Sequence, residues 1–296
     1  MATDGACPTA FETLFTKNVP HLLEMIFMSL DYESFKTCLK VSTKWRALLT
    51  SESYLEKAKS LYHGEIVRDE GKLWLAAKQG NIGKVRSLSS NIFVNVNCVK
   101  GADRSTPLCE AVESACALSN RARTKASLKK IVLLLLDRGA NPNLGDINGW
   151  TPLHSTNPRK GNEDIVQLLL ERGADPDLAA TNSGTGTGTT LLHLAAERGN
   201  IDVTQLLLDR GAKHTNTSHY GHTPLHYAAM EGHKDIVRLL LNAGADPYKE
   251  NDRRETPLLV AQGALNDPYC GIFGSKPAAY MDVVAMLSDA MKEERQ

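Results

Sequence analysis

A short motif, Thr-Pro-Leu, recurs along the C-terminal three-quarters of the chain and constrains the fold more than any other feature. It begins at Thr106, Thr151, Thr223 and Thr256, and Thr190 begins a close variant, so successive copies start 45, 39, 33 and 33 residues apart. A leucine-rich run that ends in Gly-Ala follows each of the first four copies. Such a period indicates a stack of similar units, each of which buries its apolar face only against its neighbours.

One copy, residues 223–248, shows what each part of the unit does. Thr223 can cap a first helix, and Pro224 suits the first turn of a helix, where no backbone donor is needed. Ala228 and Ala229 are small enough to let helices of neighbouring units approach closely. The leucine-rich run supplies the apolar face of a second helix, and Gly244 ends that helix in a left-handed conformation. Each unit is therefore predicted to be a pair of short helices.

These motifs resemble ankyrin repeats. The Thr-Pro-Leu-His, Ala-Ala, Leu-Leu-Leu and Gly-Ala-Asp positions of that family match residues 71–292, which we interpret as six repeats. The first copy, from Gly71, is degenerate, and the last carries Ser288 where a leucine is usual, as is typical of a capping repeat. The resemblance implies an α-solenoid with β-hairpin loops that binds other proteins along its hairpin tips and first helices.

Three insertions lengthen the repeats. Residues 113–127 and 265–279 are expected between the two helices of their repeats, and the Gly-Thr-rich residues 182–189 lengthen a hairpin loop. The first insertion leads into a basic run, residues 121–130, which we interpret as an elongated helix or loop in solvent. A nuclear address or a contact with an acidic partner is the alternative interpretation. An extra residue near Asn157 predicts a distorted first helix in the third repeat.

Residues 19–54 carry a different pattern, in which apolar side chains at helical spacing predict three short helices. The sequence around Leu22-Leu23, Ile26-Phe27 and Leu30-Asp31, followed by Val41 and Trp45, resembles an F-box. Val19 stands where that family has a leucine before the proline, and one residue is missing after Pro20.

The F-box resemblance implies a partner, a Skp-family adaptor of cullin-RING ubiquitin ligases. The residues that it implies as the adaptor-facing or supporting apolar surface are Val19, Pro20, Leu23, Ile26, Phe27 and Leu30. The alternative is that these side chains only fill a three-helix core.

The phase of the ankyrin repeats predicts which residues contact a target protein. Trp150 and Tyr220 stand out, because aromatic side chains are frequent binding hot spots. The predicted contact strip consists of Asn148, Trp150, Glu197, Arg198, His219, Tyr220, His222, Met230, Glu231, Arg253 and Glu255.

Composition limits the partners and the compartment. The 34 basic and 34 acidic residues cancel, which removes the general electrostatic reason to expect nucleic acid or a membrane surface as a partner. The first residues do not form a signal peptide, and no apolar run is long enough to span a bilayer. The six cysteines contain no Cys-x-x-Cys pair, which fits reduced thiols in the cytoplasm or nucleus.

No arrangement typical of catalysis or metal binding emerges. His222 and His226 are close in sequence, but His222 precedes the helix start, so the two would not share a helical face. The ankyrin resemblance implies that His226, His154 and His193 are structural histidines that bond to the backbone. We expect no enzymatic activity, no cofactor and no metal.

The sequence thus predicts an all-α protein: an N-terminal tail (1–18), a three-helix F-box-like unit (19–54), a linker (55–70), six ankyrin repeats (71–292) and a short tail (293–296). The function it favours is substrate recognition for a Skp-cullin-F-box ubiquitin ligase. One alternative is an ankyrin scaffold or inhibitor without an adaptor. A regulator that binds nucleic acid or chromatin through the basic run is another, which the zero net charge disfavours.

Overall fold

The protein is described by a computed structural model that defines residues 29–41, 52–117, 122–156, 162–181, 188–266 and 277–293. The described residues up to Gly71, together with 91–94, form one compact unit, and the described residues of 72–90 and those from Asn95 onward form a second. Within the described ranges every regular element is a helix, and the one β contact is an isolated antiparallel bridge between Lys100 and Ser105. The predicted all-α fold class is confirmed.

In the described residues, the first unit is built on helices α3 (Tyr32–Val41), α5 (Glu52–Leu61) and the beginning of α6 (His63–Lys78). Asp31 caps α3, because its carboxylate accepts a hydrogen bond from the Ser34 N–H at 2.9 Å. The core of this unit is largely aromatic, with Leu30 and Leu55 packed against it; its buried members are Tyr32, Phe35, Ala58, Tyr62, Ile66 and Phe93.

The segment interpreted as a linker, residues 55–70, supplies much of this core. Ala58, Tyr62 and Ile66 are buried in it, since they recur every four residues along α5 and α6 and so share one face. The boundary between the two units falls inside α6, and residues 91–94 return to the first unit with Phe93. The first unit therefore draws on more of the chain than residues 19–54.

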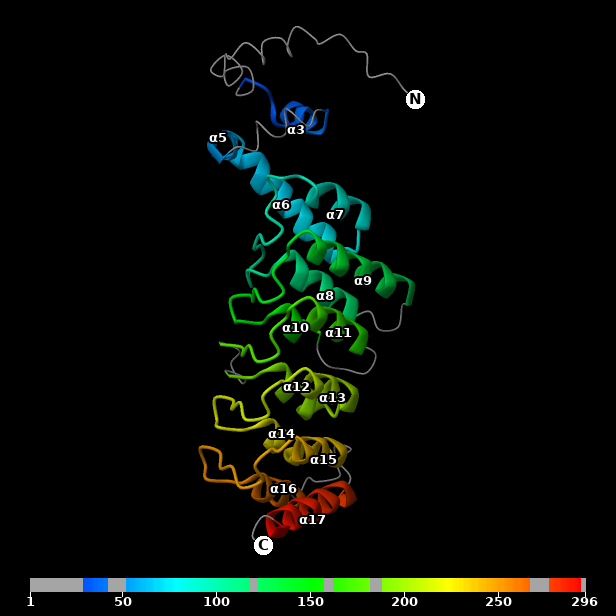
Figure 1. The fold of residues 1–296 in the computed structure, drawn as a ribbon, viewed down its shortest axis with the longest axis vertical. Coiled ribbons are helices and arrows are strands. Elements are labelled where there is room, and N and C mark those ends of the chain that lie inside the picture. The colour runs from blue at the N-terminus through cyan, green and yellow to red at the C-terminus, as the bar shows by residue number, and fades with distance from the viewer. Residues whose placement is uncertain are drawn as a thin grey trace. The chain divides into compact units, whose positions relative to one another are not determined.

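The second unit stacks helices in consecutive pairs, and Figure 1 shows these pairs in sequence order. The end of α6 pairs with α7 (Ile82–Ser89). The following pairs are α8 (Pro107–Ala117) with α9 (Ala122–Asp137), α10 (Pro152–Ser155) with α11 (Glu163–Glu171), α12 (Leu191–Arg198) with α13 (Ile201–Asp209), α14 (Pro224–Met230) with α15 (Lys234–Asn242), and α16 (Pro257–Leu265) with α17 (Pro277–Glu293).

The loops between pairs form tight turns rather than the expected β-hairpins. The position two residues before each repeat's threonine has a positive φ, 71° at Gly221 and 61° at Arg254, as a turn tip requires. Adjacent tips are joined by single backbone hydrogen bonds, such as those from Ile147 N–H to the Asp103 carbonyl (2.9 Å) and from Asp252 N–H to the Tyr220 carbonyl (3.1 Å). Such isolated bonds are too few to form a ladder, which explains why no strand forms in the described loops.

The insertions extend helices where the structure describes them. α8 and α9 have 11 and 16 residues, longer than the helices of the fourth pair, and their gap spans only residues 118–121. The basic run therefore lies largely on α9, where Lys129 forms an ion pair with Asp164 of α11 at 3.0 Å. α10 has only four residues, as expected from the extra residue in its repeat. The Gly-Thr-rich residues 182–187 and residues 267–276 lie outside the described ranges.

Candidate functional site

Three buried histidines anchor the starts of the first helices. In the fifth repeat, Thr223 N–H donates to Nδ1 of His226 at 3.1 Å, and Nε2 of His226 lies 3.1 Å from the Glu255 carbonyl of the next repeat. His154 and His193 make the corresponding contacts with their own threonines and with later backbone carbonyls. The predicted structural role of these histidines is confirmed. Each one closes a capping box and joins two repeats.

The hydrogen bonds of these three histidines determine the protonation state of their imidazole rings. Nδ1 accepts a hydrogen bond from a backbone N–H, and Nε2 donates to a carbonyl, which is the pattern of a neutral imidazole. Burial lowers the pKa of His193 and of His226 to about 4 and also lowers that of His154. At neutral pH all three are uncharged links within the stack.

The described residues offer no evident catalytic group. The rings of His222 and His226 stack with centroids 5.4 Å apart, but Nε2 of His222 accepts a hydrogen bond from the Asn251 amide at 2.8 Å. No cluster of three or more metal-ligating side chains occurs in the described ranges. Burial raises the pKa of the Cys109 thiol to about 11, which keeps it protonated and unreactive.

Of the residues predicted to face the adaptor, Val19, Pro20, Leu23, Ile26 and Phe27 lie outside the described ranges. Leu30 is half-buried and packs against the aromatic core of the first unit. Its carbonyl accepts a hydrogen bond from the Tyr62 hydroxyl at 2.7 Å. Leu30 therefore supports the unit from within.

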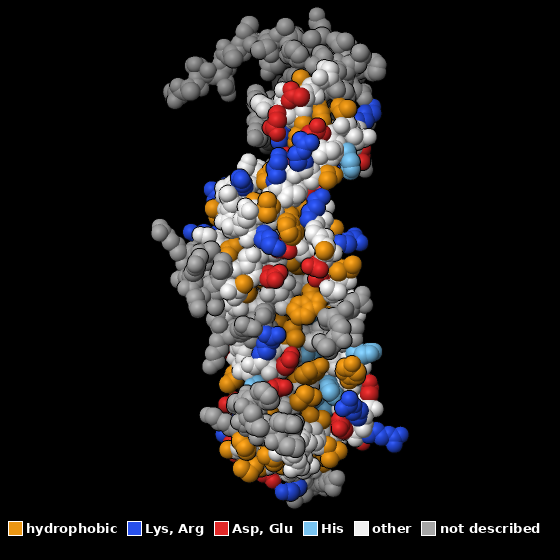
Figure 2. Space-filling model, turned by 180° about the vertical axis from the view of Figure 1, so that it is seen from behind, with side chains coloured by type: hydrophobic (Ala, Val, Ile, Leu, Met, Phe, Trp, Pro, Cys, Tyr) orange, Lys and Arg blue, Asp and Glu red, His pale blue; other side chains and the backbone are white. Residues whose placement is uncertain are grey.

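The predicted contact strip is accessible along its length. Its half-buried members are Asn148, Trp150, His222, Met230 and Glu255. Its exposed members are Glu197, Arg198, His219, Tyr220, Glu231 and Arg253. Figure 2 shows a face of the molecule on which hydrophobic side chains form a band with acidic and histidine side chains beside it.

The structure brings one part of the strip together around a cavity of about 390 Å³. Asn148 and Trp150 line it from the turn before α10, and Arg198 lines it from the end of α12. Asp146 holds this turn in place, since its Oδ1 accepts hydrogen bonds from the N–H groups of Asn148 (2.8 Å) and Trp150 (2.9 Å). His154, beneath the turn, lies with its ring 5.7 Å from that of Trp150.

A second part of the strip is an aromatic and histidine cluster on the fifth and sixth repeats. Tyr220 is 52% exposed and contacts His219, with ring centroids 5.2 Å apart, and His222, at 6.5 Å. The Asn251 amide bridges His222 to the Glu255 carboxylate, which it contacts at 3.0 Å. The cluster therefore exposes the large Tyr220 ring to solvent beside residues that are held in place by hydrogen bonds.

The three acidic residues of the cavity were not among the predicted contacts: Asp146, and the second-repeat residues Asp103 and Glu113. The positions of Asp103 and Glu113 within their repeat could have predicted that they lie on this surface. Asp103 stands three residues before its repeat's threonine, the position of Asn148 and Tyr220, and Glu113 stands seven residues after it, the position of Glu197.

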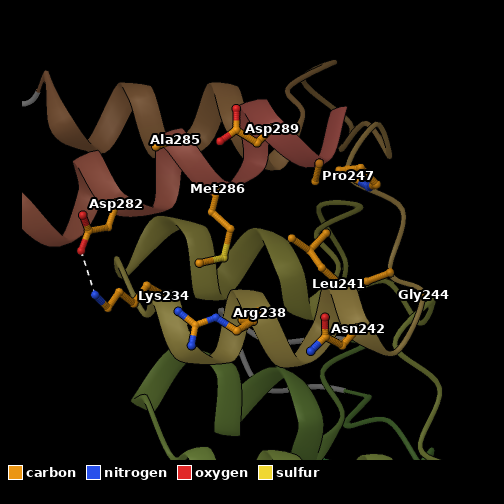
Figure 3. Close-up of a pocket in the computed structure, with 12 residues that line it drawn as sticks. Lys234, Arg238, Leu241, Asn242, Gly244, Pro247, Asp282, Ala285, Met286 and Asp289 are labelled. Atoms are coloured by element: carbon orange, nitrogen blue, oxygen red, sulfur yellow. Dashed lines mark hydrogen bonds and ion pairs between the residues drawn. The ribbon is translucent and has the colours of Figure 1, made fainter. Parts of the chain in front are cut away.

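A larger cavity, of about 820 Å³, lies between α15 and α17 (Figure 3). Lys234 and Asp282 face each other across it at 2.9 Å, and Arg238 lies 3.6 Å from Asp235 on its own helix. The charged side chains of this cavity are therefore already partly paired with one another. It lies between second helices, away from the predicted contact strip.

Comparison with known families agrees with this architecture. The family model "Ankyrin repeats (3 copies)" matches residues 73–180, 121–217 and 159–251, and the model "F-box domain" matches residues 18–57. A search of curated proteins found no match to the chain. None of the described helices is long and apolar enough to cross a membrane. F-box and ankyrin domains are modules for protein interaction. The chain belongs to the ankyrin-repeat proteins and carries an F-box domain before its repeats.

Proposed function

We propose that this protein is a substrate-recognition subunit of a Skp-cullin-F-box ubiquitin ligase. Its F-box would bind a Skp-family adaptor, and its repeats would bind the protein to be ubiquitinated. The observation that carries the proposal is the presence of both modules in one chain, with the F-box match at residues 18–57 and the repeat match at residues 73–251. A chain with one adaptor module and one recognition module can hold two proteins close together, which raises the effective concentration of one near the other.

The accessible contact strip supports the recognition half of this proposal. It combines a half-buried tryptophan beside a cavity with an exposed tyrosine, the side-chain types that contribute most to protein interfaces. The basic run offers less support for a nucleic-acid function, because Lys129 is already paired with Asp164 and the whole chain has no net charge.

Co-purification with a recombinant Skp-family adaptor tests the adaptor half. The full chain should retain the adaptor, whereas a Pro20→Ala/Leu23→Ala/Ile26→Ala variant should lose it, because the substitutions remove apolar contact area. Tyr220→Ala, a surface change in the repeats, is the matched control and should bind the adaptor normally. Equal recovery of the adaptor by the triple variant and the wild type would exclude this proposal. Thermal unfolding of both variants distinguishes lost contact from lost folding.

A further inference from the structure

The cavity beside Trp150 has an unusual balance of charge. Three carboxylates line it, from Asp103, Glu113 and Asp146, against the single guanidinium of Arg198, so it carries a formal excess of two negative charges. No ion pair involves any of the three carboxylates within the described residues.

Several acidic side chains elsewhere in the stack have basic partners. Glu110 pairs with Lys78 at 3.0 Å, and Asp137 pairs with Arg172 at 2.6 Å. The three carboxylates of the cavity have no such partner among the described residues, and they converge there from three different segments: the second-repeat turn, α8 and the third-repeat turn. A ligand that brings a positive charge would complement this site.

The aromatic side chain in the wall of the cavity indicates which kind of cation the cavity would bind. Trp150 lines it with a partly buried indole, and aromatic faces attract cations, tryptophan most strongly. The Trp150 N–H donates a hydrogen bond to the Asp146 carboxylate, which holds the backbone of Trp150 in position before any ligand arrives. The volume, about 390 Å³, falls in the range of pockets that enclose a small ligand group, roughly 300–1,000 Å³.

We propose that this cavity receives an arginine side chain of the target protein. The guanidinium would stack on Trp150 and pair with the carboxylates of Asp103 and Glu113. Arginine fits better than lysine, because its planar guanidinium both stacks on aromatic rings and binds carboxylates with two parallel hydrogen bonds. Phosphate groups, and so nucleic acid, are disfavoured by the excess negative charge. The inference rests on the proposed target-binding role of the repeats and is independent of the adaptor.

Selection from a library of short random peptides, with the full chain as bait, tests this inference. The peptides that the wild type retains should be enriched in arginine at one position. Replacing that arginine by citrulline, which keeps the shape and removes the charge, should weaken binding by about tenfold or more, as loss of a charge-assisted hydrogen bond does. Replacement by lysine should weaken it less.

Variants assign the effect to the cavity. Asp103→Asn/Glu113→Gln keeps the size of both exposed side chains and should abolish the arginine preference, and Trp150→Leu should weaken binding of the same peptides. Asp235→Asn/Asp282→Asn, on the outer helices, is the matched control and should leave the preference unchanged. An unchanged preference in Asp103→Asn/Glu113→Gln would overturn the inference.

The outcomes also separate this inference from the proposed function. A consensus without basic residues would overturn the arginine site while leaving peptide recognition by the repeats in place. Failure to retain any peptide would count against both the site and the recognition half of the proposed function. Adaptor co-purification is measured on the same variants and should be normal in all of them.

Discussion

At the residue scale, the histidine of each Thr-Pro-Leu-His motif does the work that a glutamate does in the usual capping box. Its ring accepts a hydrogen bond from the N–H of the helix cap and donates one to a carbonyl of a later repeat, so a single side chain satisfies backbone groups of two neighbouring repeats. This task requires the neutral imidazole, because a protonated Nδ1 cannot accept the capping hydrogen bond. The stack is therefore sensitive to acid at these positions.

Stability should accordingly fall in mild acid. Folded His193 and His226 have a pKa of about 4, whereas in the unfolded chain the pKa is near the ordinary value of about 6.5. Between these values the unfolded state binds protons that the folded state does not, so the free energy of unfolding decreases as the pH falls through this window and is unaffected by these groups above it. At about pH 5 each of the two should cost about 2 kcal/mol.

Urea unfolding at about pH 7.5 and at about pH 5 measures this loss. A His193→Gln/His226→Gln variant should be less stable at the higher pH, but it should lose less on acidification than the wild type does. If the variant and the wild type lost the same free energy, the acid sensitivity would come from other groups, such as the carboxylates.

At the element scale, the helices of the first unit and those of the repeats depend on separate cores. α3, α5 and the first half of α6 bury an aromatic cluster in which Phe35 is fully buried and its ring lies 5.3 Å from that of Tyr62. Lys36 adds an ion pair with the buried Asp69 at 3.3 Å and lies over the Tyr32 ring at 4.4 Å. Each repeat instead buries branched aliphatic side chains between helix pairs, for example Val203 and Leu207 on α13.

Replacement of Phe35 by alanine should therefore destabilise the first unit, by about 3–5 kcal/mol, because it leaves a cavity in a close-packed core. Hydrogen exchange followed by mass spectrometry should show faster exchange on α3 and α5 and unchanged exchange on α12 to α15. Leu207→Ala on α13 is the matched control and should accelerate exchange in the repeats. Uniform acceleration in both units after Phe35→Ala would show that they unfold together.

At the scale of the whole molecule, the repeats form a linear array in which stability is shared between neighbours. α14 packs against α16, and α15 against α17, so the fifth repeat is covered by the sixth. The sixth repeat contributes the buried side chains of Ala261, Tyr280, Val283 and Leu287 to this junction or to its own pair.

Removal of residues 252–296 should lower the urea midpoint, because it exposes the apolar surface of α14 and α15 and removes one interface of the array. Hydrogen exchange should become faster on α14 and α15 first and least on α8 and α9. Removal of residues 294–296 alone is the control and should change nothing. An unchanged midpoint after the larger deletion would show that the sixth repeat contributes no stability.

The sequence by itself determined the parts of this protein whose chemistry is local. The 33-residue period, the Thr-Pro caps and the glycines after the second helices specify helix pairs through short-range backbone and capping interactions, and the described helices begin at Pro107, Pro152, Pro224 and Pro257 as the motif predicts. The structural histidines followed from the same motif. A few dozen residues were also enough to indicate the F-box.

The tertiary structure decided what depends on residues distant in the chain. The packing of α5, α6 and Phe93 into the first unit could not be read from residues 19–54, because its contacts join segments about 60 positions apart, as in the hydrogen bond between Tyr32 and Asn91 (2.9 Å). The charge of the cavity beside Trp150 arises only when neighbouring repeats are stacked, since Asp103 and Glu113 come from the second repeat, Asp146 from the third and Arg198 from the fourth. The position of a residue within its repeat predicts whether its side chain faces solvent, but the stacking of the repeats decides which of these side chains come close together.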